Sequence, residues 1–138
     1  MKKTILISLS LLLFSCSVLK AQENNSTTND NNYATLYLYR FNNGVAIQPY
    51  GVKLNDSLIC YMEAGTAFEV KIAKTGKVLL TAKTETTRKL ELNLKPGEKY
   101  YILCSLDLGF IQYNANLKLV SKEKGEKQYA EVKAKQKN

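Results

Sequence analysis

Short runs of β-type residues, each closed by a turn signal, fill this sequence from Ala34 onward. Phe68, Val70 and Ile72 alternate with charged residues, which is the pattern of a strand with one buried face and one wet face. No window shows the sustained apolar period of about 3.6 residues that an amphipathic helix requires. Short strands at intervals of about eight to twelve residues are typical of a sandwich or a barrel. The sequence therefore predicts an all-β fold, an antiparallel β-sandwich of about seven or eight strands, with a small closed barrel as the alternative.

Turn residues separate the predicted strands and indicate where they end. Asn55 and Asp56 leave two residues between two runs and predict a tight hairpin. Residues 95–98 (KPGE) are a strong turn signal, because proline fixes φ and glycine accepts a positive φ. The run that follows is apolar on both faces and is expected to be a central strand. The predicted strands are residues 34–41, 50–54, 57–62, 68–72, 77–84, 90–94, 100–106 and 115–120. A weaker segment near residues 128–132 is either an edge strand or a short helix.

The N-terminus has the pattern of a bacterial export signal. Residues 1–3 (MKK) are cationic, and residues 5–14 form an uncharged apolar run. The run is shorter than the roughly 20 apolar residues that a transmembrane helix needs. The sequence therefore predicts a signal peptide (1–21), a flexible polar linker (22–32), one β-sandwich domain (33–121) and a Lys-rich C-terminal tail (122–138). No transmembrane span is expected in the mature protein.

Two processing positions compete within this signal. Residues 19–21 (LKA) place a small residue just before Gln22, and cleavage after Ala21 is favoured. Residues 13–16 (LFSC) approximate a lipobox in which Cys16 is acylated, although Phe14 is bulky for its position. We therefore expect an exported protein of the periplasm or cell envelope, or a secreted one, with an outer-membrane lipoprotein as the alternative.

Several turns and strand starts together resemble one bacterial family. The segments that carry the likeness are residues 34–40, 52–56, 65 and 94–101. Over most of residues 34 to 121 this pattern resembles the family called domain of unknown function 2846. The resemblance implies an immunoglobulin-like β-sandwich in an exported or lipid-anchored envelope protein, with no established activity. The sequence has Asn55-Asp56 where the family often has Asp-Gly, and residues 74–77 (KTGK) where a Pro-Gly turn is usual.

The composition argues against several function classes. There is no histidine, which removes Ser-His and Cys-His nucleophile pairs and the commonest zinc ligand. No Walker, Rossmann or EF-hand pattern is present. Arg40 and Arg88 are the only arginines and lie far apart in the sequence, whereas a nucleic-acid-binding surface favours concentrated arginine with stacking aromatics. We expect no enzymatic activity, no cofactor, no bound metal and no nucleic acid.

The net charge is basic, but only moderately so once the signal is removed. The formal charge of +8 falls by three when Lys2, Lys3 and Lys20 leave with the signal peptide. Much of the remaining excess lies in the Lys-rich tail, where lysine is interleaved with glutamate. We expect this tail to be solvated and partly frayed, with a patch for anionic glycans or lipid head groups as the alternative.

Tyr37 and Tyr39 are the candidate binding residues. They share one face of the first predicted strand, with Leu36 and Leu38 on the other face. If the leucines face the core, the tyrosines form an aromatic ladder toward solvent that suits a sugar ring or a protein partner. The alternative is that they pack within the fold and bind no ligand.

Cys60 and Cys104 are the cysteines that remain after the signal is removed. Their same-face neighbours are apolar, so both are expected to point into the core. They would form a disulfide if their Cα atoms lay within about 7 Å of each other. The alternative is two small buried thiols without a bond.

Two functions from different classes fit these features. The first is a non-enzymatic structural or interaction module of the cell envelope or exterior, which holds an envelope protein through an edge strand or the tyrosine face. The second is a carbohydrate- or cell-wall-binding module that uses the same tyrosines with the basic tail.

Overall fold

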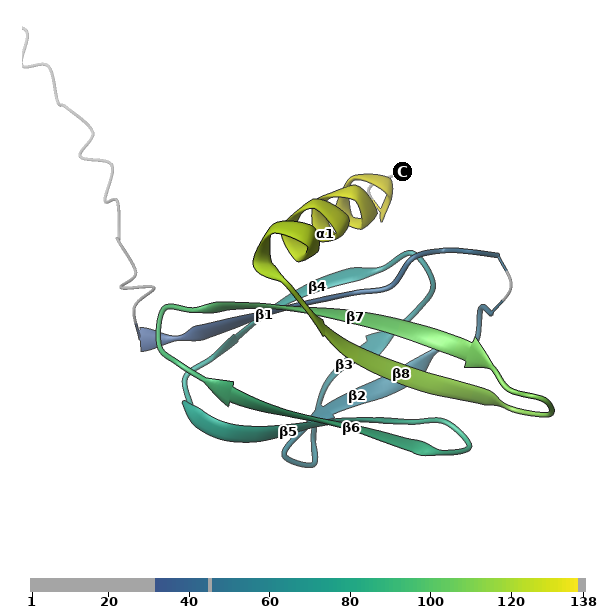
Figure 1. The fold of residues 1–138 in the computed structure, drawn as a ribbon, viewed down its shortest axis with the longest axis horizontal. Helices are drawn as coiled ribbons and strands as arrows, with labels where there is room; N and C mark the ends of the chain where they lie inside the picture. Colours follow the sequence, from purple (N-terminus) through teal and green to yellow (C-terminus); the bar gives the residue numbers. More distant parts are fainter. Residues whose placement is uncertain (1–31, 45, 137–138) are drawn as a thin grey trace, which may run out of the picture.

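The computed structural model describes residues 32–44 and 46–136, which form two four-stranded β-sheets and one long helix (Figure 1). The elements are β1 (Ala34–Tyr39), β2 (Tyr50–Leu54), β3 (Ser57–Met62), β4 (Ala67–Ile72), β5 (Gly76–Lys83), β6 (Thr87–Leu94), β7 (Lys99–Leu108), β8 (Tyr113–Val120) and α1 (Lys122–Gln136). The β1 sheet has the strand order β4-β1-β7-β8, and the β2 sheet has the order β3-β2-β5-β6. The predicted β-sandwich is confirmed, and the closed barrel is not formed.

The core lies between the two sheets and is built from alternate residues of their strands. Leu36 and Leu38 of β1, Val52 of β2, Leu80 of β5 and Ile102 of β7 are completely buried in one apolar cluster. Each side chain of this size contributes about 1.5 to 3 kcal/mol when it leaves water. Leu36 and Leu38 therefore face the core, which is the condition on which an outward orientation of Tyr37 and Tyr39 depends.

The predicted tight hairpin joins β2 to β3. Leu54 pairs with Ser57, so the turn consists of Asn55 and Asp56 alone. Both residues have positive φ, 45° and 70°, as a turn that follows the right-handed twist of the strands requires. Asparagine and aspartate reach this conformation more readily than most residues with a side chain. The register of the pair shifts between Val52 and Lys53, which marks a β-bulge next to the turn.

One strand pair departs from the predicted antiparallel arrangement. β1 and β7 are parallel, with Leu36 opposite Tyr100 and Leu38 opposite Ile102. Both strands start at the same end of the sandwich, because the turn before β7 is bonded to the start of β1: the Gly97 N–H donates to the Tyr33 carbonyl at 2.8 Å. Between these strands the chain crosses to the other sheet and back twice, through β2 and β3 and then through β5 and β6, which permits a parallel pair without a hairpin.

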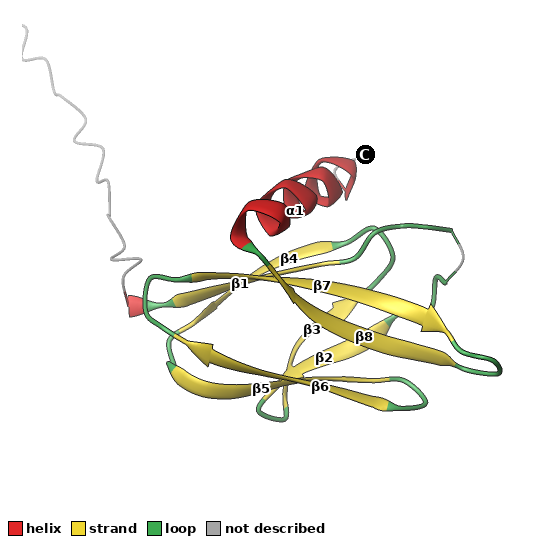
Figure 2. Ribbon diagram, in the orientation of Figure 1, coloured by secondary structure: helices red, strands yellow, loops and turns green. Residues whose placement is uncertain are grey.

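The predicted Lys-rich tail is a helix of 15 residues, α1, that packs on the outer side of the β1 sheet (Figure 2). The edge-strand alternative for this segment is wrong, and the helix is longer than the short one that the sequence allowed. The inward stripe is Gly125, Tyr129, Val132 and Gln136, at helical spacing. Only two of these four have large apolar side chains, so the segment shows no apolar period in the sequence.

The predicted signal peptide, Cys16 and all but the last residue of the predicted linker lie outside the described residues. In the part of the chain that the structure covers, no helix has both the length and the apolar character needed to cross a membrane.

Candidate functional site

Helix α1 covers the two tyrosines that the sequence singles out. Tyr37 and Tyr39 point away from the sandwich core, as predicted, but Tyr39 is 0% exposed. Its hydroxyl donates a hydrogen bond to Oε1 of Gln128 on α1 at 2.8 Å. Burial raises the pKa of Tyr39 to about 12, so the hydroxyl remains a protonated donor at ordinary pH. The predicted aromatic ladder facing solvent is therefore wrong at Tyr39, because the sequence did not place a helix over it.

Tyr37 is half-buried in an aromatic cluster under the same helix. Its ring stacks on Tyr101 with centroids 4.8 Å apart and meets the edge of Tyr129 at 4.9 Å. Ring contacts of this kind are worth about 0.5 to 1.5 kcal/mol each beyond the buried area. A groove of about 450 Å³ remains beside α1. The rings chiefly hold α1 on the sheet and do not form a free stacking platform.

Cys60 of β3 and Cys104 of β7 are both buried, as predicted, and both are free thiols. Burial raises the pKa of Cys60 to about 11 and also raises the pKa of Cys104. Thiols with raised pKa values are poor nucleophiles and poor metal ligands at neutral pH. The structure thus contains two small buried thiols, which is the alternative considered for the sequence, and no disulfide joins Cys60 and Cys104. The third candidate cysteine, Cys16, lies outside the described residues.

The most unusual surface lies at the end of the sandwich opposite the start of β1, which we call the distal end (Figure 1). It comprises the β1–β2 loop (40–44 and 46–49), the β5–β6 turn (84–86) and the β7–β8 turn (109–112). The sequence analysis assigned no role to these three segments.

The β7–β8 turn exposes large apolar side chains. Phe110 is fully exposed and Ile111 is 87% exposed, and Leu108 beside them is also exposed. The turn has a defined shape, because the Gly109 N–H donates to the Gln112 carbonyl at 2.8 Å. Adjacent large apolar side chains on a surface cost free energy in water and usually mark an interaction site. The signal was present in the sequence as a Phe-Ile pair within a predicted break between strands.

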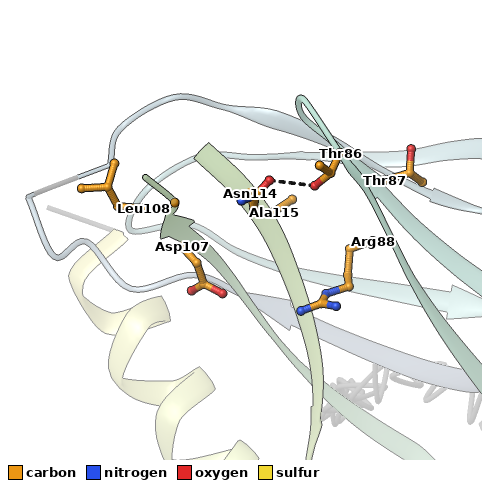
Figure 3. Close-up of a pocket in the computed structure, with 8 residues that line it drawn as sticks. Thr86, Thr87, Arg88, Asp107, Leu108, Asn114 and Ala115 are labelled. Atoms are coloured by element: carbon orange, nitrogen blue, oxygen red, sulfur yellow. Dashed lines mark hydrogen bonds between the residues drawn. The ribbon is translucent and has the colours of Figure 1, made fainter. Parts of the chain in front are cut away.

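A polar cleft of about 340 Å³ lies next to this turn, between β6 and the β7–β8 hairpin (Figure 3). Thr86 and Asn114 face each other across it, with Thr86 Oγ1 2.8 Å from Asn114 Oδ1. Arg88 Nε donates to Asn116 Oδ1 at 3.2 Å, and Asn116 Nδ2 donates to Asp107 Oδ2 at 3.0 Å. The cleft therefore offers a guanidinium, a carboxylate and neutral hydrogen-bonding groups to a ligand.

Arg40 fixes the third segment of the distal end, the β1–β2 loop. This side chain is 2% exposed, and it donates to the carbonyl of Gln48 at 2.9 Å and to that of Ala46. It also reaches the Met62 carbonyl at 3.3 Å and lies 5.4 Å from the centroid of the Tyr50 ring. Burial lowers the pKa of Arg40, but a guanidinium stays charged in proteins. Its bonds hold the loop that carries the exposed side chain of Ile47.

The chemistry of the distal end is suited to binding. The cleft contains no thiol, and the hydroxyls of Thr86 and Thr87 have no histidine to act as a base. Among the described residues, no group of three or more Cys, Asp or Glu side chains is arranged to hold a metal ion.

Comparison of the chain with protein-family models, with curated proteins and with solved structures found no match. The fold and the distal end define a class, a small two-sheet β-sandwich with a helix on one side and an apolar turn beside a polar cleft at one end.

Proposed function

We propose that this protein is an exported, non-enzymatic interaction module that holds a partner protein at its distal end. The observation that carries the proposal is the full exposure of Phe110 together with that of Ile111, on a turn of defined shape. A protruding apolar pair fits an apolar pocket on a partner, and its burial there supplies the free energy of binding.

The polar cleft supplies the second part of such an interface. Protein–protein interfaces have an apolar centre and a rim of hydrogen-bonding groups. At the distal end, Phe110 and Ile111 provide the centre, and Arg88, Asp107 and Thr86 provide a rim. The hydrogen bonds through Asn116 hold Arg88 and Asp107 in place before a partner arrives. A preorganised rim loses less side-chain entropy on binding.

The export signal in residues 1–21 supports a location in the cell envelope or outside the cell. The start of β1 lies at the end of the sandwich opposite the β7–β8 turn (Figure 1). In a protein tethered through Cys16, the anchor would therefore join the sandwich at the end opposite the distal end, which leaves the distal end free for a partner.

The resemblance to the family called domain of unknown function 2846 is part of the same proposal. Its support is the layer architecture of two packed sheets and the turns at residues 55–56 and 95–98. In the constant-type immunoglobulin order the first two strands pair in one sheet, whereas β1 and β2 here lie in different sheets. We therefore propose an immunoglobulin-like fold only in the sense of a two-sheet sandwich.

Carbohydrate binding through Tyr37 and Tyr39 has less support. Sugar rings stack on exposed aromatic faces, and the helix buries Tyr39 completely and packs Tyr129 against Tyr37. A ligand at these rings would have to displace α1.

The test of the distal end uses the double variant Phe110→Ser/Ile111→Ser. Leu119→Ser is a matched control, because Leu119 is also exposed but lies on β8 away from the turn. Envelope extract of the producing bacterium is passed over each immobilised protein, and retained proteins are purified and titrated individually. We expect a protein that binds the wild type and the control and loses affinity for the double variant at least tenfold, about 1.4 kcal/mol.

The free energies of unfolding of all three proteins, measured in urea, should agree within about 0.5 kcal/mol, because the changed side chains are exposed. Equal retention of every bound protein by the double variant and the wild type would exclude the turn as the binding site.

The export step is tested separately by mass spectrometry of the mature protein. We expect the mature protein to begin at Gln22. An acylated Cys16 at the N-terminus would instead show a lipoprotein. Unprocessed protein that still begins at residue 1, found in the cytoplasmic fraction, would contradict export.

A further inference from the structure

The two outer faces of the sandwich differ in what covers them. Helix α1 packs against β1, β4 and β7 of the β1 sheet (Figure 2). Over the outward side chains of β2, β3, β5 and β6, which we call the bare face, no other described element packs. A whole sheet face is therefore available to a ligand.

The bare face is cationic. Lys53, Lys77, Lys83 and Lys89 all point outward from it and are exposed, and Glu91 is the one carboxylate among the outward residues of these strands. None of the four lysines makes a hydrogen bond or an ion pair within the described part of the chain. Their charge is not neutralised internally, and the positive potential extends into solvent.

Strand register sets the spacing of these charges. Lys53 pairs with Thr81, and Thr81 pairs with Lys89, so the three residues form one row across β2, β5 and β6. Neighbouring strands lie about 4.8 Å apart, which places Lys53 and Lys89 about 10 Å from each other. Lys83 is opposite Thr87, two residues from Lys89 on β6. Positive charges thus alternate with neutral hydroxyl groups.

A groove of about 480 Å³ runs over β5 and β6 on the same face. Lys77, Leu79, Glu91 and Asn93 line it. At the opposite edge of this face, on β3, Tyr61 pairs with Gly51 of β2 and is 61% exposed. A groove with charged and amide walls suits an extended chain more than a flat surface does.

We infer that the bare face binds a linear anionic polysaccharide. Its carboxylates or sulfates would pair with the four lysines, its hydroxyls would bond to Thr81, Thr87 and Asn93, and one sugar ring would stack on Tyr61.

Nucleic acids and anionic lipid layers match the bare face less well. It has no arginine, because Arg88 points into the cleft of Figure 3, and it has one exposed aromatic ring, so it lacks the stacking series of a nucleic-acid surface. The most exposed large apolar side chains, which a lipid layer would bury most readily, are at the distal end.

The test compares Lys53→Gln/Lys89→Gln with the control Lys124→Gln/Lys127→Gln, which removes the same charge from the exposed side of α1. The probes are polygalacturonate, neutral dextran, phosphatidylglycerol vesicles and double-stranded DNA. We expect the wild type and the control to bind polygalacturonate, with an affinity that falls as the NaCl concentration rises. The Lys53/Lys89 variant should bind about tenfold more weakly, with a smaller salt dependence.

A second variant, Tyr61→Ala, separates stacking from charge. It should weaken polygalacturonate binding without changing the salt dependence, because no charge is removed. Equal loss in both lysine variants, or no binding to polygalacturonate, would overturn the inference. Tighter binding to vesicles or DNA than to polygalacturonate would overturn it as well, and would assign the bare face to that class. Thr87 borders both surfaces but is changed in neither test, and no changed residue is shared, so this test and the test of Phe110 and Ile111 fail independently.

Discussion

Gly125 is the residue that lets α1 lie close against the β1 sheet. A Cβ atom at this position would be 2.2 Å from Cβ of Tyr101, well inside van der Waals contact. The glycine is buried in the first part of the helix, and its N–H donates to the Ser121 carbonyl at 2.8 Å. The backbone of α1 therefore rests directly on a tyrosine of β7.

This contact predicts a reversal of a familiar effect. Replacing a helical glycine by alanine usually stabilises a protein by up to about 1 kcal/mol. Gly125→Ala should instead destabilise it by about 1 to 3 kcal/mol, because the methyl group must push the helix off Tyr101. Urea unfolding measures the change, with Lys127→Ala on the exposed side of α1 as the control near zero. A gain in stability for Gly125→Ala would show that α1 does not pack here.

Asp56 allows a second prediction at a single residue. It sits at the second turn position with φ of 70°, where glycine is the preferred residue. Asp56→Gly should stabilise the protein by about 0.5 to 1 kcal/mol, because the left-handed conformation costs glycine nothing. Asp56→Ala should destabilise it, because alanine adopts the left-handed conformation less readily than aspartate does. Thermal melting distinguishes the two, and changes of the same sign would exclude this turn conformation.

At the scale of elements, α1 depends on a few specific contacts. Val132 is almost fully buried among Tyr39, Ala67 and Tyr101. Gln136 Oε1 accepts the Ala67 N–H at 3.1 Å, which satisfies a backbone donor at the start of β4. Apart from Gly125, Gln128 and Tyr129, the remaining residues of the helix are exposed and mostly charged. Loss of the Val132 contact should therefore free the whole element.

Val132→Asp tests this attachment. A carboxylate at this buried site has no partner, so the helix should detach while the sandwich stays folded. Lys133→Asp makes a larger change in charge at a neighbouring exposed position and should leave α1 in place. Limited trypsin digestion measures whether α1 is detached, because the helix carries several lysines and a detached helix is cleaved faster. Equal digestion of both variants would mean that Val132 does not hold the helix.

The strands could be predicted from the sequence and this helix could not. Strand alternation such as Phe68, Val70 and Ile72 directly encodes a sheet with one buried face. The stripe of α1 that faces the sheet consists of a glycine, a glutamine and only two large apolar side chains, so it carries no comparable period. The distal end could not be predicted from the sequence either, because it is formed by three loops that are far apart in the sequence and meet only in the folded structure. Exposure of Phe110 follows from the hairpin geometry and from no local pattern.

At the scale of the whole molecule, the two cysteines lie in opposite sheets, Cys60 in β3 and Cys104 in β7. We expect two reactive thiols per chain in denatured, unreduced protein that lacks residues 1–21. In the folded protein both should react slowly with iodoacetamide at neutral pH, because burial blocks access and raises their pKa values. A titre of zero thiols, with a lower melting temperature after reduction, would instead show a disulfide that joins the sheets.

The position of β1 in the middle of its sheet has a consequence for how the chain is made. Its two neighbours are β4 and β7, and β7 comes from the last third of the sequence. During synthesis or translocation that starts from the N-terminus, β1 emerges long before the strand that completes its pairing. Its six residues, ATLYLY, contain no charge and no proline, which is the composition that favours self-association of unpaired strands. A nascent chain therefore has to keep this segment apart from its copies until residue 108 has emerged.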